Sequence, residues 1–233
     1  MMYSSPVFVW LRNILRRFGL NKLLTRVFSR GGYEDRFGPA LLAEVHTGDT
    51  VWDVGANVGL YAVQFSERVG SRGLVVAFEP VPACFCALQH ACRDMSLVRP
   101  VNVALGSADG ELTMVLEDDA LAATHRVVEA SKQLVDATHV SVPVRSAGSF
   151  VKDHPELFPN IIKVDVEGFE GAVFEGLKNL LPDRRLRCIG IEVHFGLLEA
   201  RGESGTPKEL EKGLQTHGFE VSWTDASHLI AAR

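Results

Sequence analysis

The stretch "VWDVGANVGLY" (residues 51–61) decides the fold, because an apolar run ends in an acid and then meets two glycines before a helix-compatible segment. A dinucleotide-binding turn follows Gly-x-Gly-x-x-Gly, but with Gly55 first, the second and third positions hold Asn57 and Leu60. A phosphate-binding loop ends in Gly-Lys-Ser/Thr, which this stretch lacks. It therefore predicts a strand-to-helix turn for a different kind of ligand.

The charges around this turn favour a cationic nucleoside. Gly55 supplies permissive backbone dihedrals, and Asn57 is among the few residues that tolerate a left-handed conformation. The carboxylate of Asp53 would repel a pyrophosphate but suits an ammonium or a sulfonium. Glu79 closes the next strand in "VVAFEP" and can accept both hydroxyls of a ribose. The ligand that combines these groups is S-adenosylmethionine, so the sequence predicts a methyltransferase; the alternative is a glycine turn in another α/β domain.

Apolar strand-like runs alternate with helix-compatible segments along the chain. This alternation is typical of a parallel sheet covered on both faces. A helix bounded by Thr206 and Gly218 then leads into an antiparallel hairpin, and residues 107–160 interrupt the alternation as an inserted hairpin with a lid. The predicted strands are 50–54, 74–79, 98–105, 161–166 and 188–193.

Length and charge indicate one domain behind a basic arm. The 233 residues, 46% of them hydrophobic, suffice for one buried core, so we expect an arm over residues 1–35 and a domain over 36–233. Residues 1–30 hold six of the 24 basic residues and no acid, which leaves 18 basic against 29 acidic residues elsewhere. An acidic body argues against a nucleic-acid partner. The four cysteines fit reduced thiols, which predicts a cytoplasmic protein.

The arm "VFVWLRNILRRFGLNKLLTRVFSR" (residues 7–30) has apolar residues at helical intervals with basic residues between them. Gly19 is expected to divide it into two helices. Such a helix can lie peripherally on an anionic membrane, pack on its own sheet, or contact a second subunit of an oligomer, and the sequence leaves these alternatives open. No apolar run approaches the ~18 residues of a membrane span.

Five segments resemble FkbM-type methyltransferases in order and spacing: "DVGANVGLY", "VVAFEPVP", "NVALGSADGE", "IIKVDVEGFE" and "IGIEVH". The likeness spans about residues 48–195, and "KVDVEG" is its most specific mark. It implies a class I methyltransferase (Rossmann-like) α/β fold with seven mainly parallel strands, and S-adenosylmethionine as the methyl donor. Where the family usually has Leu-Asp before the fourth strand, this chain has Ala147-Gly148, so no role is carried over for that Asp. The implied cofactor contacts are Asp53, Gly55, Asn57, Gly59 and Glu79, with Asn102 and Ala104 near the adenine.

Two later strands supply candidate catalytic groups. Strand alternation puts Lys163, Asp165 and Glu167 on one face, and Glu192 shares a face with His194. If these strands are neighbours, their carboxyl ends meet where open α/β sheets bind ligands. We expect His194 to act as general base because its ordinary pKa of about 6.5 lies near neutrality. Glu192 or Asp165 can orient the ring of His194, and Asp165 could instead serve as the base itself or hold the acceptor. We assign Glu167 and Lys163 to orientation.

These acidic and basic side chains leave two other interpretations. They could form a structural salt-bridge network around Lys163, or hold a divalent metal, although no ligand spacing here is diagnostic and no metal site is predicted. The leading function is O-methylation of a sugar, glycan or related small-molecule hydroxyl. An RNA methyltransferase is the alternative, but base methylation commonly uses an Asn/Asp-Pro-Pro-aromatic motif where this chain has "DVEG". A non-catalytic cofactor-binding module is the third candidate.

Overall fold

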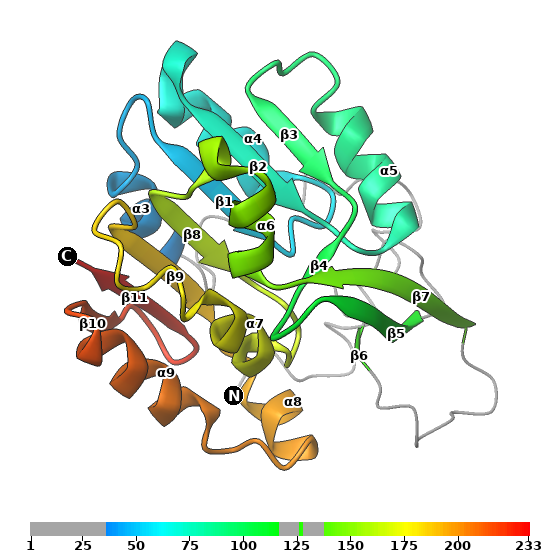
Figure 1. Cartoon of the computed structure of the whole chain (residues 1–233), viewed down its shortest axis with the longest axis vertical. Helices are drawn as coiled ribbons and strands as arrows, with labels where there is room; N and C mark the ends of the chain where they lie inside the picture. The colour runs from blue at the N-terminus through cyan, green and yellow to red at the C-terminus, as the bar shows by residue number, and fades with distance from the viewer. Residues whose placement is uncertain (1–35, 117–125, 128–137) are drawn as a thin grey trace, which may run out of the picture.

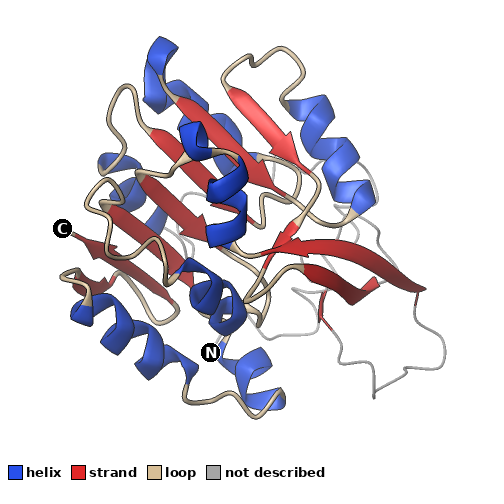
Figure 2. Cartoon of the chain, viewed as in Figure 1, coloured by secondary structure: helices blue, strands red, loops and turns tan. Residues whose placement is uncertain are grey.

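The computed structural model describes residues 36–116, 126–127 and 138–233. The predicted basic arm and most of the predicted lid lie outside the described residues. In the described part, helices cover both faces of a central sheet, and a second, smaller sheet lies beside it (Figures 1 and 2). This is the α/β architecture that the alternation of apolar segments predicts.

The elements follow one another in the alternating order expected of such a fold. The strands are β1 (Thr50–Val54), β2 (Leu74–Phe78), β3 (Val98–Val101), β4 (Ala104–Leu105), β5 (Gly110–Leu116), β6 (Arg126–Val127), β7 (Thr138–Arg145), β8 (Ile161–Val164), β9 (Cys188–Glu192), β10 (Glu220–Trp223) and β11 (His228–Ala232). The helices are α3 (Phe37–Ala43), α4 (Leu60–Val69), α5 (Pro82–Ala91), α6 (Ala147–Asp153), α7 (Glu170–Leu177), α8 (Phe195–Ala200) and α9 (Thr206–Thr216), with short 3-10 turns η1 (Gly70–Arg72) and η2 (Pro155–Leu157). None of the helices in these ranges combines the length and apolar character needed to cross a membrane.

The main sheet has seven strands in the order β10-β11-β9-β8-β1-β2-β3. Its strands are parallel except at β11, which runs antiparallel to both β9 and β10. This confirms the predicted mainly parallel sheet with a C-terminal antiparallel hairpin. The smaller sheet has the order β4-β7-β5-β6, and its antiparallel pair β5 and β7 confirms the predicted inserted hairpin.

The predicted strand 98–105 is wrong as one element, because the chain divides it between the two sheets as β3 and β4. The side-chain amide of Asn102 lies at the division and donates to the carbonyl oxygens of Glu79 and Pro80, at 2.8 and 3.0 Å. These bonds tie the exit of β3 to the exit of β2. The predicted strand 161–166 is also too long, since β8 ends at Val164.

The core fixes the direction in which β1 presents its side chains. Trp52 is fully buried against α6, where its ring meets Phe150 edge-on at 5.4 Å, and its indole N–H donates to the carbonyl of Leu157. Val51 is buried in the cluster on the opposite face, with α3 and α4. Because side chains alternate along a strand, Asp53 shares the face of Val51 at the carboxyl end of β1.

Candidate active site

The glycine turn (residues 55–59) has the left-handed backbone that its sequence predicts. Gly55, Asn57 and Gly59 have φ values of 78°, 49° and 93°, and Gly59 precedes the first turn of α4. A β-carbon on Gly55 would lie 1.9 Å from the carbonyl oxygen of Asp165. Only glycine therefore allows the turn to cross the end of β8 so closely.

Glu79 is anchored directly against the glycine turn. One carboxylate oxygen accepts the N–H of Asn57 and the other accepts the N–H of Val81, both at 2.8 Å. Burial raises the pKa of Glu79 to about 7, although the two amide hydrogen bonds oppose that shift. Each oxygen has a second lone pair, so the carboxylate retains capacity to accept ligand hydroxyls.

The two residues expected near an adenine border the loop that carries Glu79. The amide nitrogen of Asn102 is occupied by the carbonyls of Glu79 and Pro80. Ala104 is buried in a small apolar cluster that also contains Val81 and Val144. Their contact with an adenine stays a prediction, and the visible role of Asn102 is to hold the loop in place.

Asp53 and Lys163 form a buried pair because the parallel register places them side by side on β1 and β8. The ammonium of Lys163 lies 3.4 Å from Asp53, 3.1 Å from Asp165 and 4.7 Å from the centre of the Tyr61 ring. Burial works to lower the pKa of Lys163, but the two carboxylates outweigh it and raise that pKa, so the lysine stays charged. Burial raises the pKa of Asp53, against the opposing effect of Lys163.

Asp53 also has unused hydrogen-bonding capacity. Both of its carboxylate oxygens are buried, and within the described part of the chain neither accepts a hydrogen bond of good geometry, although Lys163 pairs with one of them and the backbone N–H of Ala62 acts to lower the pKa of the carboxyl. A buried carboxylate of this kind is costly unless another polar or cationic group meets it. These buried acceptor oxygens fit the ammonium and sulfonium that the sequence predicts for the ligand.

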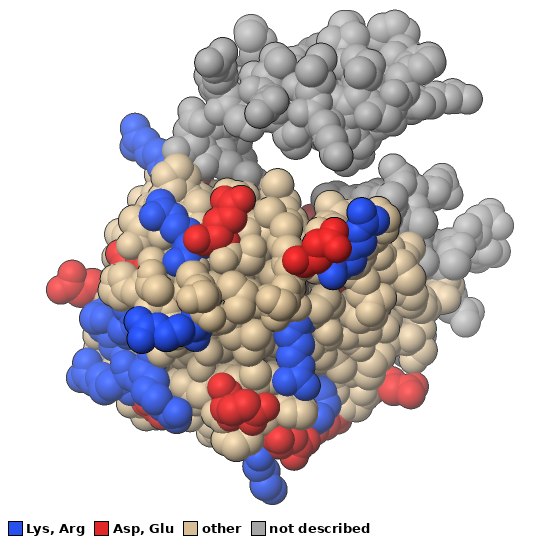
Figure 3. Space-filling view, turned by 90° about the horizontal axis from the view of Figure 1, so that it is seen from above, with Lys and Arg blue, Asp and Glu red and all other residues tan. Residues whose placement is uncertain are grey.

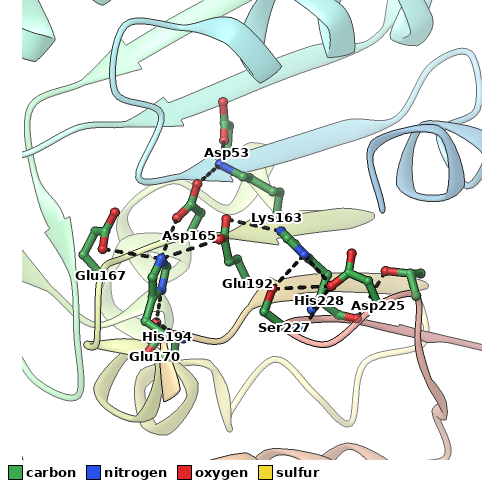
Figure 4. A network of polar contacts seen from close by, with 11 residues as sticks. Asp53, Lys163, Asp165, Glu167, Glu170, Glu192, His194, Asp225, Ser227 and His228 are labelled. Carbon is green, nitrogen blue, oxygen red and sulfur yellow. Dashed lines mark hydrogen bonds and ion pairs between the residues drawn. The ribbon is translucent and has the colours of Figure 1, made fainter. Parts of the chain in front are cut away.

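Four predicted residues meet at the carboxyl ends of β8 and β9, as Figure 4 shows, and we call Asp165, Glu167, Glu192 and His194 the rim cluster. The Nε2 atom of His194 lies 3.4 Å from a carboxylate oxygen of Glu167, 3.7 Å from one of Glu192 and 3.8 Å from one of Asp165. One potential ligand atom from each of Asp165, Glu167 and His194 falls within 4.8 Å of the other two. The cluster can therefore move protons or hold a cation.

His194 does not have the ordinary pKa expected from its sequence. Its Nδ1 lies 2.6 Å from a carboxylate oxygen of Glu170, which also accepts the N–H of Gly168 at 3.0 Å. Burial works to lower the pKa of His194, but Glu170, Glu167 and Asp165 outweigh it and raise that pKa to about 9. The imidazole is thus protonated near neutral pH, which removes the reason for naming it the general base.

Glu167 is the rim carboxylate whose titration falls near neutrality. It lies in the turn between β8 and α7 with a φ of 46°, in the left-handed region of backbone conformation. Burial raises the pKa of Glu167 to about 7, with contributions from Asp165 and Glu192 and opposition from His194. The rim cluster therefore holds an excess of negative charge that a proton partly offsets.

Sequence reasoning missed Glu170 and His228. Glu170 is the buried first residue of α7, and its place three residues after Glu167 in "DVEGFE" is the signal that could have found it. His228 is buried opposite Glu192 in the antiparallel register of β11, with its Nε2 3.3 Å from Glu192 and its Nδ1 2.9 Å from Asp225. No local pattern in the sequence predicts the register of β11 against β9.

Figure 3 shows one face of the molecule, on which both basic and acidic side chains occur. Among the described residues there, Lys and Arg side chains gather mainly toward the lower left of the view, and Asp and Glu side chains are scattered over the face. A broad nucleic-acid footprint needs a continuous basic stripe or patch. That nucleic acid is not a partner stays a prediction.

Comparisons with known proteins agree with this geometry. The sequence profile described as "Methyltransferase FkbM domain" matches residues 53–221. The chain is 31% identical over 160 residues to the hexuronic acid methyltransferase AglP of Haloferax volcanii, covering 67% of this chain and 61% of that protein. It is 28% identical over 204 residues to the 31-O-demethyl-FK506 methyltransferase FkbM of Streptomyces tacrolimicus, covering 76% of this chain and 75% of that protein.

A solved structure supports the fold. The crystal structure of methyltransferase FkbM from Methylobacillus flagellatus KT superimposes with a TM-score of 0.53 at 14% sequence identity, covering 79% of this chain and 43% of that one. At this identity the likeness concerns the fold alone. The chain therefore has the class I methyltransferase fold, and it spans less than two thirds of the Haloferax and Methylobacillus proteins.

Proposed function

The chain belongs to the methyltransferase FkbM domain family, and we propose that it transfers a methyl group from S-adenosylmethionine to a hydroxyl group of a sugar or glycan. The observation that carries the proposal is the close crossing of Gly55 over the backbone of Asp165. Gly55 belongs to the turn proposed to hold the donor, and the side chain of Asp165 belongs to the rim cluster. Donor and acceptor groups would thus meet at one backbone crossing.

The residues around the glycine turn fit the donor by their chemistry. Asp53 offers buried carboxylate oxygens to a positively charged group, and Glu79 offers a carboxylate to ribose hydroxyls. Asn102 supports Glu79 by donating to the carbonyl oxygens of the loop that carries it, and a contact of Asn102 with the adenine stays a prediction. We assign donor binding to Asp53, Glu79 and the backbone of residues 55–59.

The rim cluster supplies the proton acceptor for the hydroxyl. S-adenosylmethionine, when bound, supplies a methyl carbon on a sulfonium, and its sulfur takes the electron pair of the broken C–S bond. The acceptor oxygen forms the new C–O bond and loses its proton to a rim carboxylate. We assign that proton to a carboxylate rather than to His194, because the imidazole is already protonated near neutrality. A positioned base typically contributes ~10²–10⁴-fold in rate.

The acceptor class is inferred from a relative together with the rim chemistry. The Haloferax relative is described as a hexuronic acid methyltransferase, and a sugar hydroxyl is a weak nucleophile that needs the base described above. A hexuronic acid unit within a glycan is therefore the first acceptor to test. Neutral hexoses are the matched comparison, because they lack only the carboxylate.

The test is transfer of a tritiated methyl group from S-adenosylmethionine by the full chain. Oligosaccharides with hexuronic acids, matched neutral oligosaccharides, RNA and protein are offered separately. We expect label in a sugar fraction, a loss of at least ~10²-fold with Asp165→Asn, and no loss with Glu199→Gln, which changes an exposed carboxylate of α8 in the same way. Label confined to RNA or protein would contradict the acceptor class, and cofactor binding without transfer to any acceptor would favour a non-catalytic module.

A further inference from the structure

We propose that the rim cluster is a divalent cation site with Asp165, Glu167 and Nε2 of His194 as its ligands. The role of this site in catalysis rests on the proposed methyltransferase function, whereas the binding of the cation does not. Cation binding itself can be measured without a methyl donor or acceptor. The sequence contains no diagnostic ligand spacing, so the inference comes from the folded arrangement.

The distances suit one small ion. Ligand atoms about 2.1 Å from a common Mg²⁺ or Mn²⁺ lie about 3–4 Å from one another. From Nε2 of His194, the nearest oxygens of Glu167 and Asp165 lie at 3.4 and 3.8 Å, and the three chosen ligand atoms are mutually within 4.8 Å. Shortening the two distances from Nε2 of His194 by about 0.4 and 0.8 Å would bring them to the separation of about 3 Å between neighbouring ligands of one ion. Carboxylate oxygens and an imidazole nitrogen form a mixed ligand set that suits Mn²⁺.

The position of Glu170 is an independent indication of a ligand at Nε2. Its buried carboxylate lies 2.6 Å from Nδ1 of His194, and it is held there by the N–H of Gly168. Metal-binding histidines characteristically donate their other ring N–H to a carboxylate, which fixes the tautomer and directs the lone pair at the metal. A cation at the rim would displace the proton from Nε2 and leave the other on Nδ1, so that the Nε2 lone pair would face Glu167 and Asp165. Glu170 is thus a positioning residue.

The charge balance also favours a cation. Lys163 is the only lysine in the network of Figure 4, and its ammonium lies between Asp53 and Asp165. Among the described residues, the ion pairs of Glu167 and Glu192 are with the imidazoles of His194 and His228. One oxygen of Asp165 bonds Lys163, while the other is the oxygen nearest to His194. The rim therefore retains both an available oxygen and an excess of negative charge. Besides the proposed ligands Asp165 and Glu167, the carboxylates of this network are those of Asp53, Glu170 and Glu192.

In catalysis the cation would bind the acceptor hydroxyl and make its oxygen more acidic. Three protein ligands leave coordination positions open for the acceptor. Glu192 lies beside the site, with one oxygen 3.7 Å from Nε2 of His194 and the other 3.3 Å from His228. The hydroxyl proton would pass to Glu192, and the acceptor oxygen would keep its electron pair for the new C–O bond. A sugar can also offer a second, adjacent oxygen to the same ion.

The test is electron paramagnetic resonance of Mn²⁺ titrated into the full chain after treatment with a chelator and its removal, with no methyl donor present. We expect the free-ion signal to decrease as Mn²⁺ binds, and Mg²⁺ to restore it by competition. Glu167→Gln and Glu170→Gln should each weaken Mn²⁺ binding about 10–100-fold. Glu199→Gln, the matched change on an exposed carboxylate, should leave it unaltered. Circular dichroism of each variant verifies that it folds.

Two results would overturn the cation site. One is an unchanged Mn²⁺ signal with the intact chain at about 1 mM Mn²⁺, the weak end of protein affinities for such cations. The other is binding that Glu167→Gln does not weaken although the variant is folded. Methyl transfer that persists in excess chelator would refute the catalytic role of the cation while leaving the proposed function standing. Loss of the proposed function would instead show as an absence of cofactor binding, which this titration does not involve.

Discussion

Substituting Gly55 by alanine tests the crossing that joins the two halves of the site. The new β-carbon would lie 1.9 Å from the carbonyl oxygen of Asp165, and the residue has a φ of 78°. The left-handed backbone costs about 1–2 kcal/mol for an alanine, and forcing a methyl group into a packed contact costs about 1–3 kcal/mol. We therefore expect Gly55→Ala to lower the free energy of unfolding by about 2–5 kcal/mol.

Gly48→Ala separates the two contributions, because Gly48 has a φ of 94° but nothing within 4 Å of its would-be β-carbon. It should cost only the dihedral part, about 1–2 kcal/mol. Urea unfolding measures both variants, and calorimetry with S-adenosylhomocysteine should show a loss of affinity only in Gly55→Ala. If Gly55→Ala is no less stable than Gly48→Ala, or binds the ligand normally, the crossing does not organise the site.

Three other variants test charges in the site. His194→Ala should lower single-turnover methyl transfer about 10–100-fold with little change in S-adenosylhomocysteine affinity, because the proposed cation loses a ligand, and near-normal turnover would exclude it from the chemistry. Lys163→Met should lower unfolding free energy by about 3–5 kcal/mol because two carboxylates lose their cation, whereas the exposed Lys178→Met should not. The folded pKa of Glu79, about 7, exceeds its ordinary 4.5, so its stabilising contribution is present below the ordinary value and lost as pH rises through 7. Urea unfolding at pH 5 and 8 should show that loss, on the order of 1–3 kcal/mol, in the wild type relative to Glu79→Gln, and parallel pH profiles would contradict it.

The main sheet could be predicted because its strands are local apolar runs bounded by turn residues. "VWDV", "LVVAF" and "IIKV" each become a parallel strand, and the asparagine at position 57 has the left-handed backbone expected of it. The strand predicted over 98–105 failed because a long-range contact decides it. The amide of Asn102 bonds the exit loop of β2, and no local periodicity records that bond.

The sequence could predict those residues of the candidate site that lie at the ends of strands. Asp165 and His194 come together because β8 and β9 are neighbours in the sheet, which the pattern of strands suggests. Glu170 and His228 were missed because their roles depend on the first turn of α7 and on the register of β11. The expected pKa of His194 was wrong for the same reason, since carboxylates distant in sequence set it.

The central claim is that the glycine turn and Glu79 hold S-adenosylmethionine. Isothermal calorimetry of the intact chain with S-adenosylhomocysteine tests it most directly. We expect saturable binding that Glu79→Ala weakens by about 1–3 kcal/mol, or about 5–150-fold, as ribose hydroxyls lose their acceptor. The exposed Glu199→Ala should bind like the wild type. Absence of binding to the intact chain, or binding of NAD in its place, would contradict the claim.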